Sequence, residues 1–188
     1  MADETLRLYA AQAQVVLDAI ERDGFSRVKW EYIQQKYGSE AWIFRQAYSF
    51  YAQHAPRYVE PPEGAESGIW CFRDPKWAAS GAGGLLLEME VPADRAILFD
   101  SRIWNRMLNL EYIGADEADE AAFARKIANM GMKSTMEAFS TSFYPTVKRE
   151  VLESWKRLFG SAEGCPDTYV EAGLWELRKE WIVSVRSV

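Results

Sequence analysis

The arrangement of hydrophobic and polar residues is most informative between Gly84 and Asp100. A leucine-rich run ends at Pro92-Ala-Asp94, and a second short apolar run follows it. Apolar runs of this length, bounded by glycine and proline, are typical of buried strands. The segment therefore predicts one strand, a tight turn and a second strand, which places the chain among proteins that mix helices and strands.

Three other regions also predict strands. Leu6, Leu8 and Ala10 alternate with less apolar neighbours, and residues 68–73 read Gly-Ile-Trp-Cys-Phe-Arg. Residues 168–188 contain two further apolar runs that complement the pair at the centre of the chain. Because these regions are far apart in the sequence, we expect distant segments to close a single sheet.

Elsewhere the apolar residues recur at intervals of three and four, which predicts helices. The helical regions are residues 13–20, 28–37, 39–51, 101–113, 123–130 and 146–159. We expect Gly24 and Gly38 to end the first two helices and Ser39 to begin the third. Asp100 is a suitable start for the fourth, and the acidic residues 115–121 suit the N-terminus of the fifth. Gly81, Gly83 and Gly84 are expected to form a flexible lead into the leucine-rich strand.

Length and composition predict one globular domain over residues 1–188. The chain is 48% hydrophobic and 14% aromatic, which is enough to build a sizeable core from most of its rings. No internal repeat or interdomain linker is visible. The expected fold is α+β, with a central mixed or antiparallel sheet of N-terminal, central and C-terminal strands covered by helices.

The net charge and the few cysteines and histidines indicate which partners and which cellular location to expect. The 22 basic and 28 acidic residues give a net charge of -6, which argues against direct binding to nucleic acid. The N-terminus has no long apolar run, so we expect neither a signal peptide nor a membrane span. Cys71 and Cys165 are too few for a disulfide framework, which favours a reducing cytoplasm. His54 is the single histidine, so we predict no histidine-based metal site.

Several strings along the chain resemble an uncharacterised family of small bacterial domains. The matching strings are Pro62-Glu-Gly64, Gly68-Ile-Trp70, 85–100, Trp104 with Leu108, Asn109 and Tyr112, 153–159, and 175–183. The resemblance covers most of the chain and implies relatives, but no chemistry. Where members often carry glutamine and a polar residue before the Trp-Glu pair, this chain has Glu171 and Gly173.

The order of predicted elements also looks like that of compact mono-ADP-ribosyltransferases. This resemblance implies that NAD is the cofactor and that a carboxylate of a late strand stabilises an oxocarbenium-like transition state. By position, it implies Tyr9, Gln12 and Trp70 for binding NAD, and Glu171 or Glu176 for catalysis. Arg57, Arg73 and Arg102 lie near predicted loop or strand ends, where their guanidinium groups are suited to a diphosphate or a partner carboxylate, although such arginines more often form surface salt bridges.

Other carboxylates have a structural interpretation. Glu171 and Glu176 are five positions apart, so on a regular strand they face opposite sides, and at most one is catalytic unless Gly173 forms a bulge. Glu88 and Glu90 share one face of the leucine-rich strand, which a solvent-facing surface explains better than an acid/base pair.

The sequence thus supports two functional hypotheses. The first is a small NAD-using, ADP-ribosyltransferase-like effector of bacterial or phage origin. The second is a non-enzymatic acidic inhibitor whose protein target is a host defence complex, where it blocks a basic surface that binds nucleic acid. Its negative charge and the aromatic residues Trp77, Tyr144 and Tyr58 motivate the second hypothesis.

Overall fold

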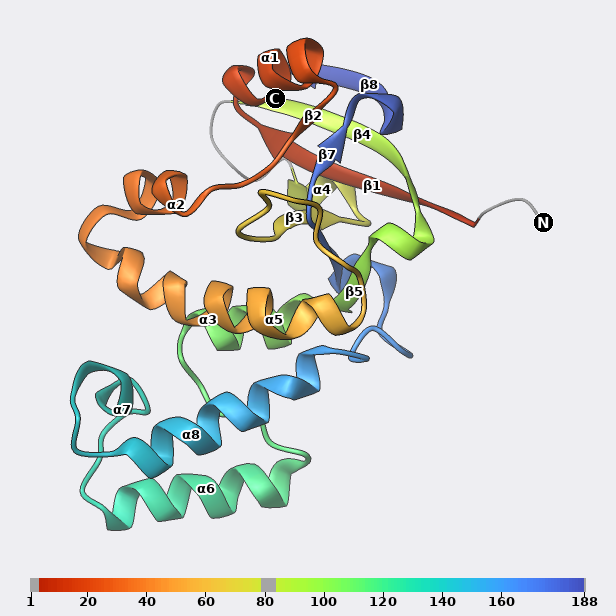
Figure 1. The fold of residues 1–188 in the computed structure, drawn as a ribbon. Coiled ribbons are helices and arrows are strands. Elements are labelled where there is room, and N and C mark those ends of the chain that lie inside the picture. The colour runs from red at the N-terminus through yellow and green to blue at the C-terminus, as the bar shows by residue number, and fades with distance from the viewer. Residues whose placement is uncertain (1–3, 79–83, 188) are drawn as a thin grey trace.

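A central six-stranded sheet organises the protein in this computed structural model, which describes residues 4–78 and 84–187 (Figure 1). The spatial order is β5-β6-β3-β1-β4-β8, and every neighbouring pair is antiparallel. The strands are β1 (Thr5–Gln12), β3 (Ile69–Phe72), β4 (Leu85–Pro92), β5 (Ile97–Asp100), β6 (Val170–Leu174) and β8 (Ile182–Ser187). A separate short ribbon pairs β2 (Phe25–Ser26) with β7 (Leu177–Arg178). The predicted α+β fold with N-terminal, central and C-terminal strands is confirmed.

The central strands β4 and β5 pair with the C-terminal strands β8 and β6, so the two segments form an antiparallel ribbon in two halves. Leu85 pairs with Ser187 at one end, and Asp100 pairs with Val170 at the other. Two 3-10 turns interrupt the ribbon near its middle, at Ala93–Arg95 and Lys179–Trp181. The strands β1 and β3 lie between the two halves of the ribbon, so β4 and β5 are consecutive in the chain yet far apart in the sheet.

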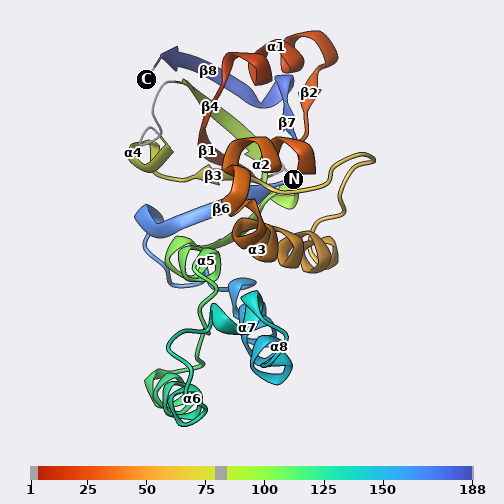
Figure 2. The same cartoon turned by 90° about the vertical axis from the view of Figure 1, so that its left-hand side faces the viewer.

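Helices cover both faces of the sheet. They are α1 (Gln14–Asp23), α2 (Trp30–Tyr37), α3 (Ala41–His54), α4 (Pro75–Ala78), α5 (Ser101–Leu108), α6 (Glu117–Asn129), α7 (Glu137–Ser140) and α8 (Pro145–Ser154). Figure 2 shows α1 on one side of the sheet and α3 with α5 on the other. Beyond α3 and α5, the helices α8 and α6 extend the structure away from the sheet in both views.

Successive side chains of a strand point to opposite faces, so the sheet lies between two hydrophobic cores. One core contains Leu8 of β1 and Leu87 of β4, packed with Ile20 of α1. The other core lies between the opposite face and the helices α3, α5 and α8, and contains Phe99 and Trp104. Burial on both faces explains why β6 is buried along its whole length.

Most predicted helix boundaries hold because their capping chemistry is local. Gly24 ends α1 in the left-handed conformation at φ 84°. The Asp100 side chain accepts a hydrogen bond from the backbone N–H of Arg102 at the start of α5. Asp116 caps α6 in the same way through the N–H of Asp119, so the acidic cluster does begin a helix.

Three boundary predictions are wrong. Ser39 does not cap α3, because it lies within the 3-10 turn Gly38–Glu40 and its side chain makes no capping bond. The helix expected to reach residue 113 ends at Leu108, and Leu110 then adopts a positive φ of 59°, which turns the chain away. The helix expected to reach residue 159 ends as α8 at Ser154 and continues only as a 3-10 turn.

Two further points concern the limits of the chain. The predicted glycine lead at Gly81 and Gly83 lies outside the described residues. In the described ranges, no helix is both long enough and apolar enough to cross a membrane.

Candidate functional site

One row of side chains crosses all six strands on the face that carries α3 and α5. Residues that pair directly across antiparallel strands point to the same face of a sheet. From β8 to β5, the pairs join Ser184, Glu88, Tyr9, Phe72, Glu171 and Phe99. Tyr9 and Glu171 are therefore separated only by β3, at a backbone distance of about 10 Å. Tyr9 of the first strand and the late carboxylate Glu171 thus share one face of the sheet, with Phe72 of β3 between them.

A cavity of about 320 Å³ opens beside Glu171. Its walls come from the end of β3, from α4, from the first turns of α5 and from the segment that enters β6. The lining residues are Phe72, Trp77, Ser101, Arg102, Asn105, Thr168, Tyr169, Val170 and Glu171. Aromatic surface and hydrogen-bonding side chains thus surround a single buried carboxyl, which is the usual composition of a small-molecule site.

The Glu171 carboxyl is unusual in its surroundings. The residue is only 6% exposed, and no hydrogen bond or ion pair reaches its carboxyl group from the part of the chain that the structure describes. Burial, together with the nearby charge of Asp100, raises the pKa of Glu171 to about 7. A carboxyl with this pKa exchanges protons near neutral pH, as a general acid or base must.

The pKa of Asp100 is shifted in the opposite direction to that of Glu171. Burial disfavours its charge, but the side chain and backbone N–H of Arg102 outweigh this effect and keep the pKa of Asp100 below its usual range. The Arg102 Nη2 lies 2.6 Å from Asp100 Oδ2. Two carboxyls with pKa values pushed apart in this way are typical of acid/base sites.

Two further contacts fix the rim of the cavity. The Arg102 guanidinium lies over the Tyr169 ring, 4.6 Å from its centroid. Trp77 Nε1 donates to Thr168 Oγ1 at 3.2 Å, and Thr168 in turn donates to Asp74 Oδ2 at 3.3 Å. These bonds join α4 to the segment before β6, and so hold the aromatic wall in place.

Glu176, the other predicted catalytic carboxylate, does not line this cavity. Its Oε2 lies 2.7 Å from Arg27 Nη2, and its Oε1 lies 3.0 Å from Arg178 Nη1. Arg27 also donates to the carbonyl of Glu63 at 2.7 Å. This ion cluster joins the β2–β7 ribbon to the loop before β3, which is a structural arrangement.

The predicted NAD-binding residues are only partly brought together. Trp70 packs in the aromatic core, 4.8 Å from Tyr51 and 4.3 Å from Trp104 between ring centroids. Gln12 lies at the far end of β1, opposite Leu85.

Tyr9 and Arg73 lie closer to the cavity. Tyr9 shares the row of Glu171 but does not line the cavity. Arg73 directly follows Phe72 and donates its backbone N–H to the carbonyl of Val170, while its side chain points to Asp167 at 3.6 Å.

Sequence reasoning identified only Arg102, as a candidate diphosphate ligand, among the residues that α5 supplies to the site. Asp100 was interpreted only as a helix cap, and Ser101 and Asn105 carried no signal of their own. The available signal was the pairing of an acidic cap with Arg102 directly after a buried strand, since such a carboxylate and guanidinium are held at a strand end.

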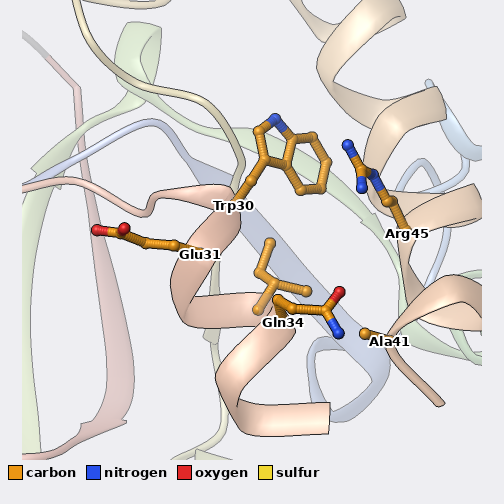
Figure 3. Close-up of a pocket in the computed structure, with 6 residues that line it drawn as sticks. Trp30, Glu31, Gln34, Ala41 and Arg45 are labelled. Carbon is orange, nitrogen blue, oxygen red and sulfur yellow. The ribbon is translucent and has the colours of Figure 1, made fainter. Parts of the chain in front are cut away.

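A second, smaller hollow of about 220 Å³ lies between α2 and α3. Figure 3 shows the Arg45 guanidinium facing the Trp30 ring across it, while Glu31 points away. Its floor includes the buried residues Ile33 and Ala41. No buried titratable group lines this hollow, so it offers less chemistry than the cavity at Glu171.

Among the described residues, no group of three or more histidine, cysteine, aspartate or glutamate side chains is arranged to hold a metal ion.

Comparison with known proteins gives one match. A family model described as a domain of unknown function (DUF3841) matches residues 7–183. No curated protein and no solved structure matches the chain. The expected likeness to mono-ADP-ribosyltransferases therefore has no structural neighbour to support it.

Proposed function

The chain belongs to the DUF3841 family, whose function is unknown, and we propose from its site that it is an NAD-using, ADP-ribosyltransferase-like enzyme. The observation that carries the proposal is the buried Glu171 carboxyl on the wall of the cavity, with a pKa raised to about 7. In this proposal Glu171 is the catalytic residue and Glu176 is structural.

The residues around the cavity suit a ligand of this class. Trp77, Tyr169 and Phe72 supply aromatic surface for a flat ring. Ser101 and Asn105 supply side chains that can bond to sugar hydroxyls, and Arg102 supplies a cation. NAD would contribute a ribosyl carbon from which neutral nicotinamide departs.

Two carboxyls would divide the chemistry between them. As an acceptor hydroxyl or amine bonds to the ribosyl carbon, the bond from that carbon to the nicotinamide nitrogen breaks, and the electron pair leaves with nicotinamide. Glu171 takes the proton that the acceptor loses. Together with burial, the nearby charge of Asp100, which Arg102 keeps ionised, raises the pKa of Glu171 and so suits this carboxyl to act as the base near neutral pH.

The direct test is NAD binding by calorimetry combined with an assay of nicotinamide release. We expect Glu171→Gln to lower turnover by at least about 100-fold, the usual contribution of a general base, with binding largely retained. We also expect turnover in the unaltered protein to rise with pH through about 7, because the base must be deprotonated.

Glu90→Gln is a matched control, because Glu90 lies on the same sheet, is exposed and does not line the cavity. Equal turnover by the Glu171→Gln and Glu90→Gln proteins would exclude Glu171 as the base. Absence of both NAD binding and nicotinamide release would exclude the enzyme.

In that case the expectation of an acidic, protein-binding inhibitor would be tested next, by pull-down at low and high salt. The aromatic residues that motivated it come from three separate elements, since Trp77 is in α4, Tyr58 follows α3 and Tyr144 precedes α8. Tyr58 is 60% exposed, but it stacks on Phe159 rather than on the other two.

A further inference from the structure

The Arg102 guanidinium is held in place by contacts that occupy only some of its N–H groups. Its Nε and Nη2 bind the carboxylate of Asp100, and its plane rests on Tyr169. In the described part of the chain, Nη1 of Arg102 makes no hydrogen bond. An oriented guanidinium with a free N–H edge is a preformed hydrogen-bond donor for a phosphate or carboxylate oxygen.

Two neighbouring polar side chains of α5, Ser101 and Asn105, can also bind a ligand in the cavity. Ser101 and Asn105 are four residues apart, so they lie on one face of the helix beside Arg102. Both line the cavity, and within the described ranges neither side chain makes a hydrogen bond. The cavity therefore has one side with aromatic rings and a carboxyl, and a polar side where the Nη1 of Arg102 has no hydrogen-bond partner among the described residues.

Size limits what the cavity can enclose. Its volume of about 320 Å³ is near the lower end of the range for small-molecule sites, about 300–1,000 Å³. This volume suits a mononucleotide better than a complete dinucleotide. The protein as a whole is acidic, with a net charge of -6, so a phosphate would need a local cation to bind.

We infer that this site recognises a ribosyl monophosphate of mononucleotide size, with the phosphate on Arg102 Nη1 and the sugar between Asn105 and Glu171. The inference rests on the proposed function and adds the substrate class to it. The mononucleotide half of NAD would then be enclosed, and the adenosine half would extend beyond the cavity and contribute little to binding.

The experiment compares the affinities of nicotinamide mononucleotide and nicotinamide riboside, which differ only in the phosphate. We expect the mononucleotide to bind the unaltered protein about tenfold more tightly. Arg102→Gln should remove this difference, and Arg102→Lys should retain only part of it, because lysine keeps the charge but loses the planar fork.

Arg95→Gln is the control, because Arg95 is likewise an exposed arginine paired with a nearby aspartate, Asp94, at 3.8 Å. It should leave the difference unchanged. Equal affinities for the two compounds in the unaltered protein, with NAD still consumed, would overturn the phosphate site but leave the proposed function standing. Failure of all three compounds to bind would overturn both.

Discussion

The Tyr51 hydroxyl lies so close to Gly173 that a side chain at that position would collide with the tyrosine ring. Tyr51 comes from α3, and Gly173 lies within β6, where it pairs with Trp70 on one side and Ile97 on the other. Because Gly173 has no side chain, Tyr51 of α3 can pack directly against the backbone of β6. The contact sets the distance between α3 and the strand that carries Glu171.

Gly173→Ala should therefore destabilise the protein by about 1–3 kcal/mol, the usual cost of overpacking a core. Gly173 does not have a positive φ, so the cost comes from the contact with Tyr51 and not from backbone strain. Urea unfolding would measure it. Gly131→Ala is a useful contrast, because Gly131 has a φ of 77° and open space around it, so its cost is backbone strain alone. Unchanged stability of the Gly173→Ala protein would contradict the close contact.

Tyr51→Phe should leave the free energy of unfolding unchanged or raise it by about 1 kcal/mol. Its hydroxyl is buried, and among the described residues it has no hydrogen-bond partner. Removing the oxygen removes an uncompensated desolvation cost while the ring contacts remain. Tyr48→Phe provides a comparison, because the Tyr48 hydroxyl lies 3.4 Å from that of Tyr37. A clear loss of stability in the Tyr51→Phe protein would indicate an ordered partner for its hydroxyl.

Glu171 should make stability fall as pH rises. Its folded pKa of about 7 lies above its usual value of 4.5, so the neutral form is favoured in the folded protein. The stability it contributes is fully present below about pH 4.5 and is lost as pH rises through about 7. At pH 8, Glu171→Gln should be more stable than the unaltered protein by up to about 3 kcal/mol, and at pH 4 the two should be nearly equal.

Chemical denaturation at several pH values would measure this difference. Taking the difference between the two proteins cancels the contribution of Asp100, whose lowered pKa acts in the opposite direction. A difference independent of pH would show that Glu171 has the same pKa in the folded and the unfolded protein.

Glu176→Gln should destabilise the fold by about 1–3 kcal/mol, because it leaves the mostly buried Arg27 guanidinium without its carboxylate, while Arg178 keeps its pair with Glu180. Thermal or urea unfolding would measure the loss. Glu180→Gln should change stability by less than about 0.5 kcal/mol, since its pair with Arg178 is exposed. Affinity for NAD should be the same in both variants. Weaker NAD binding by a well-folded Glu176→Gln protein would show that Glu176 contributes to the NAD-binding site.

The two cysteines should differ in reactivity. Burial raises the pKa of both thiols, but Cys71 is fully buried in β3, whereas Cys165 is partly exposed and accessible to a reagent. A thiol reagent should therefore modify one cysteine in the folded protein and both in denaturant. Mass spectrometry would identify the modified residue. Rapid modification of Cys71 under native conditions would show that β3 opens readily.

The local elements of this protein could be predicted from its sequence alone. Strand alternation in residues 5–12 and helical spacing in residues 41–54 reflect which face each element buries, and this information is carried by neighbours in the chain. Gly24 and Asp100 were predictable for the same reason, since capping depends on bonds within one turn. The errors at Ser39 and Leu110 occurred where two elements meet, because packing there overrides local preference.

Which carboxylate lies in the cavity depends on long-range packing, and could not be predicted from the sequence. Glu171 and Glu176 look alike in sequence, but Arg27, 149 positions away, neutralises Glu176, and no basic side chain in the described part of the chain binds Glu171. The pairing of β5 with β6 brings Asp100 close to Glu171, and burial together with this nearby charge raises the pKa of Glu171. Burial and charge depend on which distant segments fold together, and no local pattern of residues encodes them.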